Sequence, residues 1–100
     1  MTSIDLLKAY REIIIELQQL LEQQNTPGVT ERINHRRMRR EAMADAVNQI
    51  IEQINHPRTY VVIKKYYQHG LTDEAIAREI HMSRARVNQI RNAYERTSTG

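Results

Sequence analysis

Apolar residues recur every three or four positions over the first quarter of the chain, which is the spacing of an amphipathic helix. The stripe positions are Leu6, Tyr10, Ile13, Leu17, Leu20 and Gln24, widened by Leu7, Ile14 and Leu21. We therefore predict one helix over residues 4–24, with Thr2 or Ser3 as its N-cap. A stripe three positions wide per heptad has to be buried on a partner helix, either in the same chain or in another copy.

A second helix is predicted after the helix-breaking residues Pro27 and Gly28. Thr30 is its expected N-cap, and the helix continues to about Asn55. Its apolar positions are Met43, Val47, Ile50 and Ile54, joined by Ala44 and Ile51. The first turns, residues 32–40, contain little apolar surface, so they either protrude beyond the packed region or lie along a polyanion. Two helices of similar length joined by a short turn predict an antiparallel hairpin.

A third helix is expected from Arg58 to His69, with Pro57 in its first turn and Gly70 as a left-handed residue after its end. Its inward positions are Tyr60, Ile63 and Tyr67, together with Val62 and Tyr66. The one β-prone run, residues 60–63, is short and lies between a helix start and a helix stop. The sequence therefore predicts an all-α fold.

Residues 71–97 have the spacing of a helix-turn-helix, in which two short helices cross at a steep angle. Thr72 and Ser83 are the expected N-caps of the two helices, and Leu71 before the first cap pairs with Ile76 as a hydrophobic staple. Such a unit needs five apolar residues and one small residue at fixed spacings. The matching residues are Ile76, Ile80, Met82, Val87, Ile90 and the small Ala77. His81 stands where many such units have glycine, so the turn requires either a strained histidine or a different geometry.

The polar residues on the second helix of this unit, which runs from residue 84 to about 96, are of types that bond to base edges. They are Arg84, Arg86, Asn88, Gln89, Arg91 and Asn92. Arg, Asn and Gln can make paired hydrogen bonds to guanine or adenine in the major groove. We predict base contacts from Arg84 and Gln89 on one face of the helix. Phosphate contacts, which position the protein without specifying sequence, are expected from Arg86, Ser83 and Thr72.

These residues resemble region 4 of the sigma-70-type factors, which typically reads G-L-T-x-x-E-I-A followed by S-R-x-R-V-x-Q-I. The matching runs here are residues 71–77 and 82–90, and residues 57–67 resemble the preceding helix of that region. The resemblance implies that Arg84, Arg86, Asn88 and Gln89 face DNA. Ala85 stands where sigma factors often have a Glu that reads cytosine, so the base preference should differ from a −35 element. A small chain of this organisation also resembles the phage and prophage late-gene activators of the RinA and ArpU type.

The net charge of +3 conceals a segregation of charge along the chain, because residues 1–55 sum to −1 and residues 56–100 to +4. Arginine is concentrated in two segments, Arg32–Arg40 and Arg84–Arg96. Clustered arginine is typical of proteins that contact phosphate. The first segment, with Arg36, Arg37 and Arg40, could clamp flanking phosphates, enter a minor groove, contact an acidic protein or remain in solvent.

Several functions are not expected from this composition. The 100 residues include no cysteine, and the four histidines, His35, His56, His69 and His81, are too far apart in sequence to form a helical metal site. There is no Gly-rich phosphate loop and no nucleophile elbow, so we expect neither an enzyme nor a bound cofactor. The longest apolar run, residues 13–15, is too short for a membrane span, and we expect a cytoplasmic protein.

Together these patterns predict an all-α, sequence-specific DNA-binding transcription regulator, related to phage or mobile elements. Residues 1–55 would form a helical self-association segment, and residues 56–100 a sigma region-4-like helix-turn-helix domain. The expected partners are double-stranded DNA and a second copy bound through the N-terminal helices. Two alternatives stay open: a module that docks on RNA polymerase, and a phage DNA-packaging subunit of the small-terminase type.

Overall fold

The computed structural model describes residues 2–23 and 25–98 of the chain, and these form five α-helices and no strand. The helices are α1 (Ser3–Glu22), α2 (Val29–Glu52), α3 (Pro57–Ile63), α4 (Asp73–Glu79) and α5 (Arg84–Ser98), with a π-helical turn, η1 (Lys64–Gln68), directly after α3. The all-α prediction is confirmed. Gln24, the last position of the predicted stripe, and residues 99–100 of the predicted second unit lie outside the described residues.

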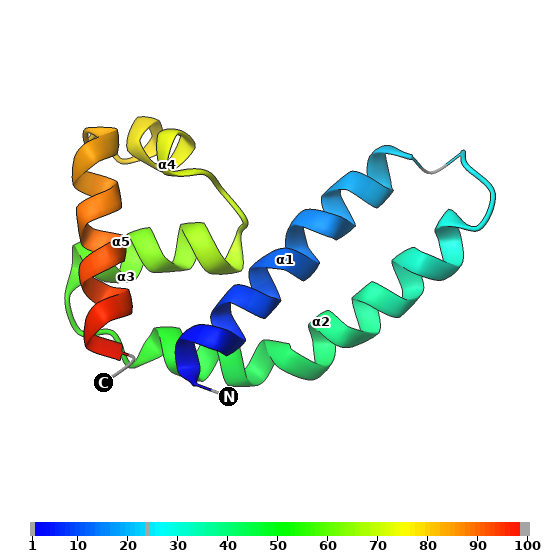
Figure 1. Cartoon of the computed structure of the whole chain (residues 1–100), viewed down its shortest axis with the longest axis horizontal. Coiled ribbons are helices and arrows are strands. Elements are labelled where there is room, and N and C mark those ends of the chain that lie inside the picture. Colours follow the sequence, from blue (N-terminus) through cyan, green and yellow to red (C-terminus); the bar gives the residue numbers. More distant parts are fainter. Residues whose placement is uncertain (1, 24, 99–100) are drawn as a thin grey trace.

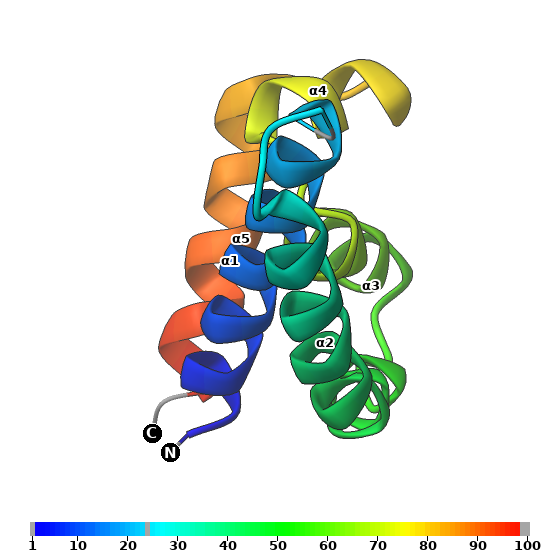
Figure 2. The same cartoon turned by 90° about the vertical axis from the view of Figure 1, so that its right-hand side faces the viewer.

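The helices divide into a long hairpin and a compact group of shorter elements. Figure 1 shows α1 and α2 side by side as an antiparallel pair, with α3, α4 and α5 gathered at one end of it. The molecule measures 43 × 29 × 17 Å along its principal axes. Figure 2 shows that α5 lies on the α1 side of this hairpin and α3 on the α2 side. The hairpin tip and α5 are therefore at opposite ends of the long axis.

The starts of the two hairpin helices are formed differently. Thr2 caps α1: its hydroxyl accepts a hydrogen bond from the Asp5 amide, and the Asp5 carboxylate accepts one from the Thr2 amide, each at 3.1 Å. The prediction that Thr30 caps α2 is wrong. The N-cap is two residues earlier, at Gly28 in the left-handed conformation with φ 83°, and the helix begins at Val29. Val29 is buried against α1. The start of α2 is therefore held by this apolar contact, and no side chain caps it by a hydrogen bond.

The apolar stripe of α1 is buried within the same chain. Ile13 and Leu17 pack against Val29 and Ile33 of α2. Residues 32–40 therefore do not protrude as one of our two interpretations required, because Ile33 is only 7% exposed. Leu21, at the end of the stripe, is 39% exposed. Self-association through these helices stays a prediction, but the stripe no longer requires it.

A second cluster joins the hairpin to the C-terminal elements. Its buried members come from α1, α2, α3 and η1: Ile4, Leu7, Tyr10, Val47, Ile51, Ile63 and Tyr67. This cluster crosses the predicted boundary between residues 55 and 56. The two predicted segments consequently share this cluster, in addition to the smaller cluster that each buries on its own.

The predicted third helix is interrupted by a change of helical type. It starts with Pro57 as expected, but after Ile63 the backbone widens into the π-helical turn η1. Gly70 follows with φ 73°, which confirms the predicted left-handed residue at this position. The widened turn contains Tyr66 and Tyr67, whose rings meet edge-on with centroids 4.9 Å apart.

Candidate nucleic-acid interface

The helix-turn-helix geometry is built by two side-chain caps and one left-handed turn residue. The Thr72 hydroxyl accepts a hydrogen bond from the Ala75 amide at 3.2 Å, and the Ser83 hydroxyl accepts one from the Arg86 amide at 3.1 Å. Both caps are as predicted. His81 has φ 55° and is the one described non-glycine residue with a positive φ, so the histidine adopts the conformation that glycine usually supplies.

All six residues predicted to pack between the two helices do so. Ile76, Ala77 and Val87 are buried, and Ile80, Met82 and Ile90 pack against them while partly exposed. The cluster is completed by Val62 of α3, and by Tyr66 and Leu71. The apolar side of α5 is thus fixed against α3 and α4, and its opposite side is left for other contacts.

A polar cluster fixes α4 and α5 to each other at the edge of this apolar contact. Arg91 donates to both carboxylate oxygens of Asp73, from Nη2 to Oδ2 at 2.8 Å and from Nε to Oδ1 at 3.1 Å. Asn88 adds a hydrogen bond from Nδ2 to Asp73 Oδ2 at 3.1 Å. The hydrogen bonds from Arg91 and Asn88, aided by the charge of Arg84, lower the pKa of the Asp73 carboxyl against the opposing effect of burial.

Two residues of the predicted polar set on α5 are therefore engaged inside the protein. Arg91 also pairs with Glu95 at 3.3 Å, and Glu95 accepts a hydrogen bond from the buried hydroxyl of Tyr67. Asn88 is half-buried, and its Oδ1 accepts a hydrogen bond from Asn92 Nδ2 at 3.0 Å. Sequence reasoning placed these residues on the correct helix but missed their partner, Asp73. The sequence pattern contains no signal that pairs Arg91 with Asp73.

The outward side of α5 keeps a line of exposed residues at helical spacing. They are Ala85, Gln89, Asn92 and Arg96. Arg84 and Arg86 are exposed on either side of this line. Our expectation that Arg84 and Gln89 share one face is wrong, because five residues of α-helix turn them about 140° apart. Gln89 lies in the middle of the outward line, whereas Arg84 lies towards Asp73.

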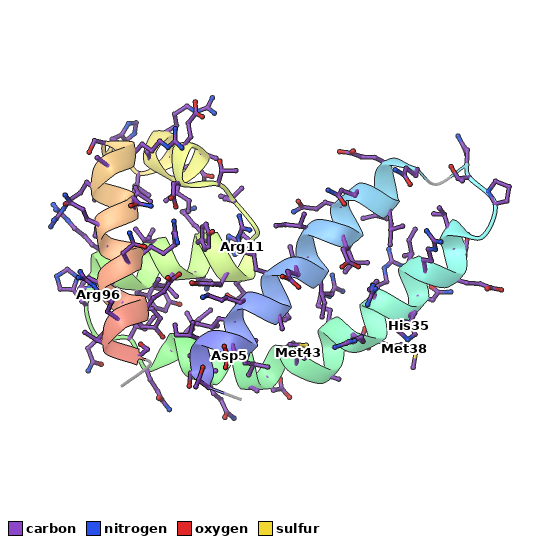
Figure 3. The ribbon with its side chains drawn as sticks, in the orientation of Figure 1. Asp5, Arg11, His35, Met38, Met43 and Arg96 are labelled. Atoms are coloured by element: carbon purple, nitrogen blue, oxygen red, sulfur yellow. The ribbon has the colours of Figure 1, made fainter. Side chains whose placement is uncertain are left out.

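A basic groove runs beside this outward line, between the start of α3 and the length of α5. Arg58 and Thr59 line its α3 side, and Arg86, Gln89 and Arg96 line its α5 side. None of its lining residues is acidic. Figure 3 shows Arg96 on α5 at the end of the molecule away from the hairpin tip. The sequence pattern placed Arg58 at the start of the third helix and gave no indication that it faces α5.

The predicted contact residues of α2 lie elsewhere. Arg36 Nε pairs with Glu16 of α1 at 2.7 Å, and Arg37 is exposed. Arg40 is half-buried beside Tyr10; burial raises the pKa of that phenol, and the charge of Arg40 opposes the rise. In Figure 3, His35 and Met38 mark this part of α2, at the other end of the molecule from Arg96. The structure does not bring the two arginine-rich segments together.

The described residues offer little for other classes of site. Over residues 2–23 and 25–98, no three His, Asp or Glu side chains are grouped so that they could hold a metal ion. In the same part of the chain, no helix combines the length and hydropathy that a bilayer crossing needs. Comparisons of the chain with known protein families, with curated proteins and with solved structures find no match.

Proposed function

We propose that this chain is a sequence-specific regulator of transcription that inserts the outward side of α5 into the major groove of double-stranded DNA. One observation carries the proposal: after α5 has packed, its outward line presents amide and guanidinium groups and no carboxylate. The one acidic residue of α5, Glu95, is half-buried and paired with Arg91 and Tyr67. Glu95 borders Gln89, Asn92 and Arg96, but its charge is balanced by Arg91, so a negatively charged duplex meets a line of neutral and basic side chains there.

Base recognition in this arrangement comes from two exposed amides. Gln89 and Asn92 stand three residues apart on the outward line, and an amide can both donate to and accept from the edge of adenine. Asn92 is oriented by the hydrogen bond that it donates to Asn88. Asn88 and Arg91 act indirectly in this proposal, because their donors are committed to Asp73.

Phosphate contacts would flank these bases on two sides. Thr72, Ser83 and Arg84 are exposed at the starts of α4 and α5. Arg58 and Arg86 line the groove on the other side of the outward line. Such contacts fix the protein on the duplex without reading sequence.

The test is a selection of duplexes from a random library, followed by affinity measurements on the selected duplex and on a scrambled one. We expect the wild-type chain to prefer the selected duplex, and Gln89→Ala to lower the ratio of the two affinities by about 5- to 150-fold. Arg39→Ala on α2 is the control, because Arg39 is exposed and directly follows Met38, which Figure 3 shows on the hairpin, away from Arg96 of α5. A wild-type chain without any duplex preference would refute the proposal.

A second candidate function is docking on a protein such as RNA polymerase, and the hairpin end favours it. Arg32, Arg37 and Arg39 are exposed there and form no ion pair with another residue that the structure describes, and Met38 is 69% exposed. Salt dependence separates the two functions. Several phosphate contacts make affinity fall steeply with salt, whereas an apolar protein interface is much less sensitive. Binding to polymerase without DNA, at an affinity that salt hardly changes, would support docking.

A further inference from the structure

The ring of Tyr66 lies between two guanidinium groups that come from opposite parts of the chain. Arg11 of α1 places its Cζ 4.0 Å from the ring centroid, and Arg91 of α5 places its Cζ 4.2 Å from it. Both guanidinium groups are therefore in contact with the same ring. Each contact is a cation–π interaction. The ring thereby connects the hairpin to the helix that we propose enters DNA.

Arg11 also holds the backbone that leads into α4. Its Nε donates to the Tyr66 carbonyl at 3.0 Å, and its Nη2 donates to the Leu71 carbonyl at 3.3 Å. Leu71 immediately precedes Thr72, the cap of α4. The Tyr66 carbonyl belongs to the last turn of η1, where carbonyl groups lack intrahelical donors, and the Leu71 carbonyl belongs to the connection before α4. A side chain that bonds both carbonyls fixes the path of the chain between the two elements. Figure 3 shows Arg11 where α1 meets this segment.

Neighbouring residues of α1 press on the same segment. Gln18 Nε2 donates to the His69 carbonyl at 3.4 Å. The backbone of Gly70 lies so close to Ile14 that a Cβ atom on the glycine would stand 3.0 Å from the isoleucine methyl. One face of α1 thus contacts the chain from Tyr66 to Leu71, which is the whole entry to the helix-turn-helix.

We infer that Arg11 is a positioning residue for α5: it sets how the recognition helix is presented, although it lies on α1, outside the helix-turn-helix. One route runs through the Leu71 carbonyl to α4, and the other through the Tyr66 ring to Arg91. Arg91 in turn fixes Asp73 at the start of α4. Both routes end on α4 and α5, and the angle between these two helices determines how α5 would fit into a major groove. The inference rests on the proposed DNA-binding function.

The experiment compares Arg11→Met, which keeps the aliphatic length, with Arg39→Met on the exposed side of α2. Amide hydrogen exchange of the full chain without DNA reports the local effect. We expect Arg11→Met to raise exchange in residues 73–92 by about three- to tenfold, with α2 unchanged. Arg39→Met should leave both regions unchanged. A uniform rise over all helices would overturn the inference, because it would show a general loss of stability.

Binding supplies the second readout. We expect Arg11→Met to lower the affinity ratio between a selected and a scrambled duplex by about three- to tenfold. Equal weakening on both duplexes would overturn the positioning role. Arg11→Lys keeps the charge but not the fork that bonds two carbonyls, so it should restore only part of the ratio; full restoration would also overturn it. If wild type prefers no duplex, the proposed function fails, and the exchange experiment still decides whether Arg11 controls α5.

Discussion

Arg91 of α5 and Asp73 of α4 form a two-pronged ion pair, 2.8 Å long at its shorter bond, with each side chain only 14% exposed. The two residues come from the two helices of the helix-turn-helix. A paired arginine–carboxylate contact fixes an angle as well as a distance. The crossing of α4 and α5 is therefore set by charge and geometry together, in addition to the apolar contacts beneath it.

This pair predicts acid sensitivity of the fold. The pKa of Asp73 in the folded chain is below its ordinary value of 3.8, so the unfolded chain takes up the proton first as pH falls. The stability contributed by Asp73 is complete above pH 3.8 and is lost as pH falls through the lower folded-state pKa. At neutral pH we expect Asp73→Asn to lower the free energy of unfolding by about 2 kcal/mol.

Denaturant unfolding of both chains between pH 2 and 7 measures this effect. The difference between wild type and Asp73→Asn should shrink as pH falls below the ordinary pKa of the carboxyl. Glu74→Gln is the matched control, because Glu74 is exposed and its contact with Arg78 is 4.0 Å long. A difference that stays constant with pH would contradict the prediction.

Replacing either of the two left-handed glycines of the described chain by alanine should lower the stability of the fold, but by different amounts. Gly28 has φ 83° with no atom within 4 Å of an added Cβ, whereas Gly70 has φ 73° and would bring its Cβ to 3.0 Å from Ile14. Gly28→Ala should cost about 1–2 kcal/mol from the backbone conformation alone. Gly70→Ala should cost about 1–3 kcal/mol more, because α1 has to move. Thermal unfolding measures both variants, and equal costs would show that α1 does not press on Gly70.

The left-handed conformation of His81 predicts that glycine at this position would stabilise the fold. With φ 55° and an exposed side chain, it carries conformational strain and no compensating burial. We expect His81→Gly to raise the free energy of unfolding by up to about 1 kcal/mol, since glycine removes the strain but has more freedom in the unfolded chain. His81→Val should lower it by about 1–2 kcal/mol, because a β-branched residue tolerates this conformation worst. Calorimetry on the wild type, His81→Gly and His81→Val measures the order of their stabilities.

The groove beside α5 predicts a change in salt dependence. Arg58→Gln and Arg86→Gln each remove one cation from its lining. If each arginine contacts one phosphate, each variant should reduce the slope of log affinity against log salt by about 1. Affinities for an unselected duplex over a range of salt concentrations measure the slope. Arg39→Gln, exposed on α2, should leave the slope unchanged; an unchanged slope in Arg58→Gln and Arg86→Gln would mean that the groove is not the phosphate contact.

Spacing predicted the buried contacts of the helix-turn-helix because those contacts are local. Ile76 and Val87 are eleven residues apart, and the short connection between their helices leaves few ways to bury both. The caps at Thr72 and Ser83 followed from the same locality. The antiparallel pairing of α1 with α2 could likewise be expected from two stripes and one short turn.

The missed features depend on partners that are distant in sequence. Asp73 engages Arg91 and Asn88, and Arg11 engages Tyr66, 55 residues away. The sequence around a polar residue on an amphipathic helix does not indicate which residue, distant in the same chain, it will contact. The widening of the backbone at Lys64–Gln68 also has no local signal in the sequence pattern, which is that of a continuous helix.

The shared core has a consequence for how this chain can be divided. Ile63 and Tyr67 are completely buried, and their cluster includes Leu7 and Val47 from the hairpin. Cut at residue 55, the C-terminal piece would expose those apolar side chains to water and lose the α1 face that holds its entry segment. We therefore expect the helix-turn-helix to lose stability when it is cut from the hairpin, although its own apolar cluster lies within residues 62–90, and we expect the whole chain to melt as one cooperative unit.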